Sequence, residues 1–249
     1  MSKSVIVTGA SRGIGKATAL LAARDGWQVC VNYRNHPEEA EAVVRDIAKA
    51  GGKAIAVQAD MADEKAILAM FARVDRELAP LGGLVNNAGF LGGETDIERF
   101  DAANMRALWD INVVAYFICA REAVKRMSTK NGGKGGAIVN VSSMSADSGG
   151  IGPRIHYATT NGARRTFTFG LAKQSGPKGI RVNGVMPGVI DTHFNDGFGN
   201  DERNAELGPK IPIGRVGVGA DIGETIVWLL SERAGYVNGA VIPVNGGFF

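Results

Sequence analysis

The chain has 249 residues, of which 45% are hydrophobic and 21% charged, and its formal net charge is +3. This composition is typical of one globular domain with a sizeable core. The net charge is too small to indicate nucleic acid binding, and the basic residues are scattered. No apolar stretch approaches the length of a membrane span, and a strand is predicted within four residues of Met1. We therefore expect neither a signal peptide nor a membrane partner.

Strand-like and helix-like runs alternate along the chain. In chain order, strands are predicted at residues 4–8, 28–32, 53–58, 83–86, 137–142, 180–185 and 240–244. Helices are predicted at 13–25, 37–50, 63–78, about 95–127, about 156–175, and from an Asp221–Glu224 cap through Leu230. This order predicts an α/β fold, in which a parallel sheet of about seven strands is doubly wound by helices on both faces. No domain boundary is evident, so residues 1–249 are expected to form a single domain.

The two cysteines lie in apolar runs, Cys30 in a predicted strand and Cys119 in a predicted helix. Such residues are typical of reduced thiols buried in a cytoplasmic protein. We therefore expect a cytoplasmic location and no disulfide.

A glycine-rich segment, T-G-A-S-R-G-I-G, joins the first predicted strand to the first helix. Its glycines permit a tight turn and a close approach of the backbone to a pyrophosphate, while the helix N-terminus faces the anion. The sequence therefore predicts a dinucleotide site, formed by Gly9, Ser11, Arg12, Gly13, Ile14 and Gly15.

Further motifs follow in order: N-N-A-G at 86–89, Asn112, Ser142–Ser143, Tyr157 and Pro187–Gly188. With the glycine loop, they make the chain resemble a short-chain dehydrogenase/reductase over essentially its whole length. The resemblance implies a Rossmann-type enzyme that moves a hydride between nicotinamide and a carbonyl or alcohol. It also implies contacts of Asp60 and Met61 with adenine, of Asn87, Ala88 and Gly89 with the adenosine ribose side, and of Pro187, Gly188, Ile190 and Thr192 with the nicotinamide amide.

The charges near the second strand bear on the choice of cofactor. Dinucleotide folds that select NAD carry an acid there, which binds the ribose 2′-hydroxyl. This chain has Asn32 at that place, with Arg34 two residues on and Arg12 in the glycine loop. Because guanidinium groups suit a phosphate dianion, we predict a preference for NADP(H) over NAD(H).

The family's catalytic group implies a role for each of four residues. Ser143 holds the substrate oxygen, Tyr157 exchanges a proton with it, and Asn112 holds a water of a proton relay. The fourth position is Asn161, where the family has the lysine of its Tyr-x-x-x-Lys motif. Asn161 can still hydrogen-bond a ribose but brings no charge. Since a free tyrosine has a pKa near 10, loss of the lysine is expected to slow turnover.

Whether another cation replaces the lysine is open at this point. Arg165 lies two helical turns from Tyr157, and Arg164 is expected to be no nearer to the phenol. Arg154 and His156 precede Tyr157 and remain possible substitutes. Two functions are therefore open: an NADP(H)-dependent oxidoreductase slowed by Asn161, and a catalytically silent protein that binds NADP(H).

Residues 189–212 are rich in glycine and charged groups, as expected of a lid over the substrate. An apolar pocket is expected from Phe90, Leu91, Met144, Gly150 and Ile151. The apolar run 109–120 is wider than one core-facing stripe needs. With the family resemblance, it implies a homotetramer. No metal site is expected.

Overall fold

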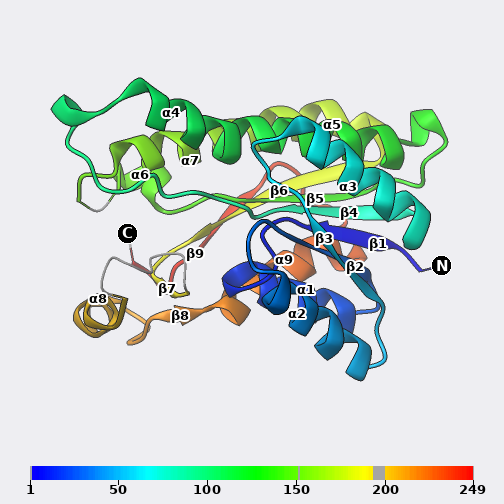
Figure 1. The fold of residues 1–249 in the computed structure, drawn as a ribbon, viewed down its shortest axis with the longest axis horizontal. Coiled ribbons are helices and arrows are strands. Elements are labelled where there is room, and N and C mark those ends of the chain that lie inside the picture. Colours follow the sequence, from blue (N-terminus) through cyan, green and yellow to red (C-terminus); the bar gives the residue numbers. More distant parts are fainter. Residues whose placement is uncertain (1, 151, 193–199, 249) are drawn as a thin grey trace.

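A sheet of parallel strands forms the middle layer of the computed structural model, which describes residues 2–150, 152–192 and 200–248 (Figure 1). In this part of the chain the sheet has seven strands in the order β3-β2-β1-β4-β5-β6-β9, and every recorded pair is parallel. The predicted fold class is therefore confirmed. The strands are β1 (Ser4–Val7), β2 (Gln28–Tyr33), β3 (Ala54–Gln58), β4 (Leu81–Asn86), β5 (Gly136–Val141), β6 (Ile180–Pro187) and β9 (Val241–Val244).

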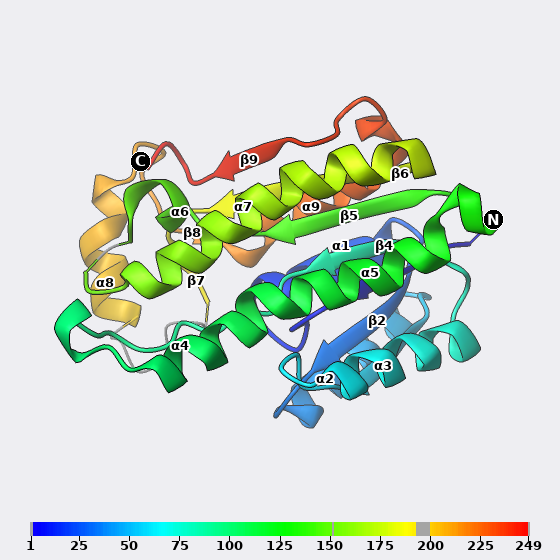
Figure 2. The same cartoon turned by 90° about the horizontal axis from the view of Figure 1, so that it is seen from above.

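Helices cover both faces of the sheet, as Figures 1 and 2 show. Successive strand residues point to opposite faces, so Val5 and Val7 join one apolar cluster while Ile6 joins the other. Burial on both faces explains why the strands read as continuous apolar runs. One face carries α1 (Gly13–Arg24), α2 (Pro37–Lys49) and α9 (Gly219–Leu230), and the other carries α3 (Glu64–Glu77), α4 (Ala102–Trp109), α5 (Ala115–Met127) and α7 (Ile155–Ser175).

The winding reverses at β1, which pairs with β2 on one side and with β4 on the other. The carboxyl ends of these parallel strands lie at one edge of the sheet. Loops that leave neighbouring strands in opposite directions open a crevice at such a point, where α/β proteins bind ligands. The fold thus brings together the segments that follow β1, β4, β5 and β6.

Smaller elements lie beside this edge. They include α6 (Ser145–Ser148), α8 (Asn200–Leu207) and a two-stranded sheet of β7 (Ile190–Asp191) and β8 (Gly217–Val218). Residues 193–199 of the predicted lid lie outside the described residues. Within the described ranges, no helix has both the length and the apolar character needed to cross a bilayer.

The long helix expected from about residue 95 is shorter and interrupted. It begins at Ala102, because the Asp101 carboxylate accepts hydrogen bonds from the amides of Ala103 and Asn104 and so caps the helix there. A π turn (Asp110–Val114) then separates α4 from α5. Such wide turns inside helices often mark functional sites.

The cap predicted at Asp221 and Glu224 is wrong, since α9 begins earlier, at Gly219. Asp221 lies in the first turn, where its carboxylate accepts from the Val218 amide at 2.8 Å and pairs with Arg215 at 2.7 Å. Glu224 instead pairs with Arg24 of α1, at 3.0 Å. The two acids therefore tie the helix to its neighbours.

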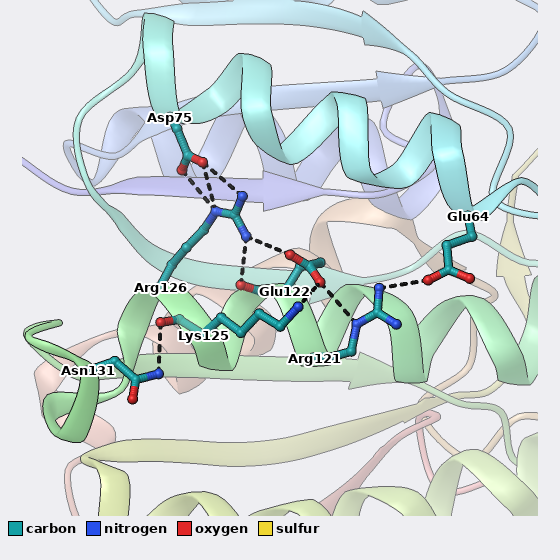
Figure 3. Close-up of polar contacts among 7 residues, drawn as sticks. All are labelled: Glu64, Asp75, Arg121, Glu122, Lys125, Arg126 and Asn131. Carbon is teal, nitrogen blue, oxygen red and sulfur yellow. Dashed lines mark hydrogen bonds and ion pairs between the residues drawn. The ribbon is translucent and has the colours of Figure 1, made fainter.

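A buried carboxylate joins α5 to α3 (Figure 3). The side chain of Glu122 is 6% exposed and contacts Arg121, Lys125 and Arg126 at 2.8–3.0 Å. Burial raises the pKa of Glu122, but hydrogen bonds from the three cations outweigh burial and lower the pKa to about 2. The network reaches α3 through pairs of Arg126 with Asp75 and of Arg121 with Glu64.

We expect the Glu122→Gln variant to unfold more easily than the parent, by about 1–2 kcal/mol at neutral pH, because charge-assisted hydrogen bonds are lost. The ordinary pKa of this group is 4.5 and its folded value is about 2. The carboxylate therefore stabilises the fold above pH 4.5, and this stabilisation fades as the pH falls towards 2. Urea unfolding at several pH values tests this, with Glu98→Gln as the exposed control outside the network. A difference independent of pH would contradict it.

Candidate active site

A cleft of about 890 Å³ lies at the carboxyl edge of the sheet. It gathers segments that are far apart in the sequence. The predicted site residues that line it are Gly9, Ser11, Arg12, Gly13, Ile14, Asn32, Arg34, Asp60, Met61, Asn87, Ala88, Gly89, Ser143, Tyr157, Pro187, Gly188, Ile190 and Thr192. Gly15, Asn112 and Asn161 are not among the lining residues. Of the expected substrate pocket, Phe90, Leu91, Met144 and Gly150 line the cleft, and Ile151 lies outside the described residues.

The glycine loop fits a pyrophosphate. Gly9 and Gly13 have φ values of 63° and 58°, in the left-handed region that other residues avoid. A Cβ atom on Gly15 would collide with the Gly9 carbonyl oxygen and lie 2.7 Å from Nδ2 of Asn87. Since α1 begins at Gly13 without a side-chain cap, its first amides are left for an anion in the cleft.

The Asn32 side chain holds the glycine loop through hydrogen bonds. It is buried, its Oδ1 accepts from the Gly9 amide at 3.0 Å, and its Nδ2 donates to the carbonyls of Val57 and Ala59 at 3.3 and 3.1 Å. An aspartate here would keep the first contact and lose the donors. Asn32 therefore fixes the position of the loop and, unlike an aspartate, adds no negative charge of its own to the cleft.

Two cations line the cleft, one from the glycine loop and one from the segment after β2. Arg34 is exposed and Arg12 half-buried, and both line the cleft. Within the described ranges, neither forms a salt bridge with a carboxylate. A phosphate on the adenosine ribose would be a suitable counter-ion for both.

Ser143 and Tyr157 face the cleft from the loop after β5 and from the first turn of α7. Ser142 differs from Ser143, because its hydroxyl donates to the buried carbonyl of Asn161 at 3.0 Å. The Ser143 hydroxyl oxygen accepts from the Ser145 amide at 3.2 Å, so its proton is left for a group in the cleft. The hydroxyl groups of Ser143 and Tyr157 thus line the same cleft.

Asn112 lies in the π turn and is fully buried. Its amide holds the loop after β4, since Nδ2 donates to the Phe90 carbonyl at 2.8 Å and Oδ1 accepts from the Phe90 amide at 2.8 Å. Nδ2 also donates to the Thr160 hydroxyl, at 3.1 Å. Its side chain therefore connects the π turn, α7 and the wall of the cleft.

Asn161 is also fully buried, one turn after Tyr157 on α7. Its Nδ2 donates to the Tyr157 carbonyl at 2.9 Å, and its Oδ1 accepts from Nη1 of Arg164 at 3.2 Å. The amide is thus engaged on both sides within the helix.

The sequence did not predict a place for Arg164 in the cleft, but the structure puts it there. Its Nε donates to the Asn112 carbonyl at 2.6 Å, Nη1 to the Val141 carbonyl at 3.2 Å, and Nη2 to the Ala88 carbonyl at 3.4 Å. Side chains on a helix lean towards its N-terminus, and an arginine is long enough to reach back along the axis. The spacing of seven residues from Tyr157 was the available signal, because it places both on one helical face.

The other candidate cations contact different partners. Arg165 pairs with Asp147, and Arg154 pairs with Glu94 at 2.6 Å. Nε2 of His156 lies 3.1 Å from the Gly93 carbonyl oxygen.

Comparison with known proteins agrees with this geometry. Residues 9–249 match a family model described as enoyl-(acyl carrier protein) reductase. The chain is 46% identical to an uncharacterized oxidoreductase, YgfF, of Escherichia coli, over 97% of this chain and 98% of that one. It is 36% identical to the 3-oxoacyl-[acyl-carrier-protein] reductase FabG of Staphylococcus aureus, over 100% and 99%.

Solved structures are also similar to the chain. A short-chain dehydrogenase of Burkholderia cenocepacia, in complex with NADP, superposes with a TM-score of 0.88 and 32% identity, covering 98% of this chain and 97% of that one. A short-chain type dehydrogenase/reductase of Mycobacterium marinum superposes with a TM-score of 0.91 at 32% identity, covering 98% and 94%. The chain belongs to the short-chain dehydrogenase/reductase family and is an NAD(P)-dependent oxidoreductase.

Proposed function

We propose that the protein interconverts a carbonyl compound and its alcohol and prefers NADP(H) to NAD(H). The observation that carries the proposal is the presence, in one cleft, of the glycine loop, Arg12 and Arg34, and the hydroxyl groups of Ser143 and Tyr157. Such an arrangement binds a phosphorylated dinucleotide and directs two hydroxyls at a substrate oxygen.

In the proposed mechanism, nicotinamide supplies the hydride for reduction and accepts it for oxidation. Ser143 donates its hydroxyl proton in a hydrogen bond to the substrate oxygen and so holds the carbonyl in place. Tyr157 gives its phenolic proton to that oxygen during reduction and regains a proton from water. In oxidation, the Tyr157 phenolate takes the proton of the alcohol. Asn112 keeps the Phe90 loop in position beside the substrate.

The substrate class is set by the walls beside Ser143. Phe90, Leu91 and Met144 make this part of the cleft largely apolar. Residues 189–212 serve as the substrate lid in this proposal, and Val189, Ile190, Thr192 and Leu207 of this segment line the cleft. We infer a small carbonyl compound with an apolar portion as the substrate.

The catalytically silent alternative rests on one observation, the uncharged amide at Asn161. Under that alternative the protein binds NADP(H) without turnover. The intact pair of Ser143 and Tyr157 in the cleft favours catalysis. NADPH oxidation in the presence of a panel of aldehydes and ketones separates the two. Measurable oxidation supports the enzyme, and NADPH binding without oxidation supports the silent protein.

We also infer that the protein acts as a homotetramer in the cytoplasm. Large apolar side chains are exposed on the side of the sheet that carries α5 and α7. Val114, just before α5, is 43% exposed, Phe117 on α5 is 53% exposed, and Phe169 on α7 is 40% exposed. An exposed apolar surface of this kind suits an interface between copies. The two buried free thiols, Cys30 and Cys119, agree with a reducing compartment.

The expected mass in solution is therefore that of four chains. Light scattering on a chromatographic peak measures it directly. The Phe117→Lys variant is expected to give a smaller mass, because a charge would be buried at the contact. A parent protein that elutes as a monomer would contradict the assembly.

A further inference from the structure

Three residues of α7 share one face of the helix. Tyr157, Asn161 and Arg164 are spaced by four and three residues, which places them in one stripe. Asn161 joins the other two, because its Nδ2 donates to the Tyr157 carbonyl and its Oδ1 accepts from Arg164. Tyr157 and Arg164 line the cleft, whereas Asn161 lies beneath them.

The Arg164 guanidinium is held by groups from four parts of the chain. Besides Asn161, it donates to carbonyls at the π turn, after β4 and at the end of β5. It also lies over the Tyr116 ring, with the guanidinium carbon 4.3 Å from the ring centre. These contacts fix a planar, permanently charged group in one orientation.

This cation is buried without a counter-ion. Arg164 is 3% exposed, and no salt bridge joins it to a carboxylate in the described part of the chain. A guanidinium has five N–H donors. One contact from Nε, two from Nη1 and one from Nη2 engage four of them, so one N–H of Nη2 is left at the wall of the cleft. A buried cation held only by neutral dipoles favours an anion nearby.

Within the described residues, the Arg164 guanidinium lies over the phenol ring of Tyr116 and shares the cleft with the phenol of Tyr157. Tyr116 of α5 donates to the carbonyls of Val141 and Ala88 at 3.0 and 3.3 Å. Burial raises the pKa of Tyr116, and Arg164 only partly opposes this rise. Tyr116 therefore stays protonated, and Tyr157 is the phenol that opens to the cleft.

We propose that Arg164 supplies the positive charge that Asn161 lacks, so that the charge enters the site from seven residues after Tyr157 instead of four. The proposal rests on the proposed function. When Tyr157 gives its proton to the substrate oxygen, the guanidinium stabilises the phenolate that remains. Arg164 thus acts through Tyr157 as a positioning residue, and Asn161 is the neutral partner that holds the guanidinium in place.

The experiment compares NADPH oxidation by the parent with that by Arg164→Leu, Asn161→Lys and the double variant Asn161→Lys/Arg164→Leu. Arg165→Leu is the matched control, because Arg165 pairs with Asp147 and does not line the cleft. NADPH fluorescence titration checks that each variant binds cofactor. Arg164→Gln keeps donors without charge and replaces Arg164→Leu if that variant does not fold.

Removal of the guanidinium charge in Arg164→Leu or Arg164→Gln is expected to lower kcat by about 10²–10³-fold. It is also expected to move the pH–rate profile for alcohol oxidation to higher pH. Asn161→Lys alone is expected to lower kcat as well, because the lysine ammonium and the Arg164 guanidinium would then be buried side by side. The double variant is expected to recover most of the parent rate, because the ammonium then enters the space that the guanidinium occupied. Arg165→Leu is expected to change neither rate nor profile.

Three other results would contradict either the role of Arg164 or the proposed function. An active parent whose Arg164→Leu and Arg164→Gln variants keep its rate and pH profile refutes the role of Arg164 and leaves the proposed function intact. An inactive parent with an active double variant also refutes that role and favours the silent protein. If every variant binds NADPH and none oxidises it with any member of the panel, the proposed function fails, and this inference fails with it.

Discussion

Tyr157→Phe is expected to lower kcat for NADPH-dependent carbonyl reduction by at least about 10³-fold, with little change in NADPH affinity. The ring of phenylalanine fills the same space, but it has no proton to give to the substrate oxygen. Positioned proton transfer typically contributes about 10²–10⁴-fold to a rate. Ser143 still binds the substrate oxygen, so substrate affinity should fall much less than the rate.

Steady-state NADPH oxidation and fluorescence titration measure the two effects separately. The control is Tyr236→Phe, because Tyr236 is fully exposed and away from the cleft. A Tyr157→Phe variant that retains the parent rate would remove Tyr157 from the mechanism. Loss of NADPH binding as well would indicate a structural role for the phenol.

Arg34→Glu is expected to weaken NADPH binding by about 10–100-fold, because one charge-assisted contact to phosphate is replaced by repulsion. NADH lacks the 2′-phosphate, so its affinity should change little or improve. The preference for NADPH should therefore fall or reverse. Arg12→Glu is expected to act in the same direction, with an additional loss for both cofactors, because Arg12 lies within the phosphate loop itself.

Dissociation constants for both cofactors, measured by fluorescence, test this. Arg45→Glu carries the same charge change on the exposed surface of α2, outside the cleft, and serves as the control. If Arg34→Glu and Arg45→Glu lost NADPH affinity equally, the loss would be a general effect of charge. A parent protein that binds NADH as tightly as NADPH would contradict the predicted preference.

Much of the fold could be predicted from the sequence, because its determinants are local. Buried parallel strands are continuous apolar runs, and the glycine loop needs particular residues at particular positions. Helix boundaries could not be predicted as well where a single side chain determines them. Asp101 caps α4 and so delays the helix, and the chain pattern does not distinguish that cap from a solvent-exposed acid.

The spacing of seven residues puts Arg164 on the helical face of Tyr157, but the spacing alone could not predict how far the side chain reaches into the cleft. Measured along the axis, residue 164 is only one residue's rise, about 1.5 Å, nearer to Tyr157 than residue 165. The structure adds the direction of the side chain and the acceptor carbonyls of the π turn, the loop after β4 and the end of β5. These acceptors come from segments far apart in the sequence, so only the folded chain brings them to the guanidinium.

The hydrogen bond between Asn161 and Arg164 also bears on how such a site can change during evolution. A chain with lysine at 161 and arginine at 164 would crowd two cations, and a chain with asparagine at 161 and an aliphatic residue at 164 would have none. On the proposal above, both single-step intermediates are poor enzymes. A sequence with Asn161 and Arg164 can then regain the Tyr-x-x-x-Lys arrangement only through a poorly active intermediate. Single point mutations would therefore seldom restore the lysine.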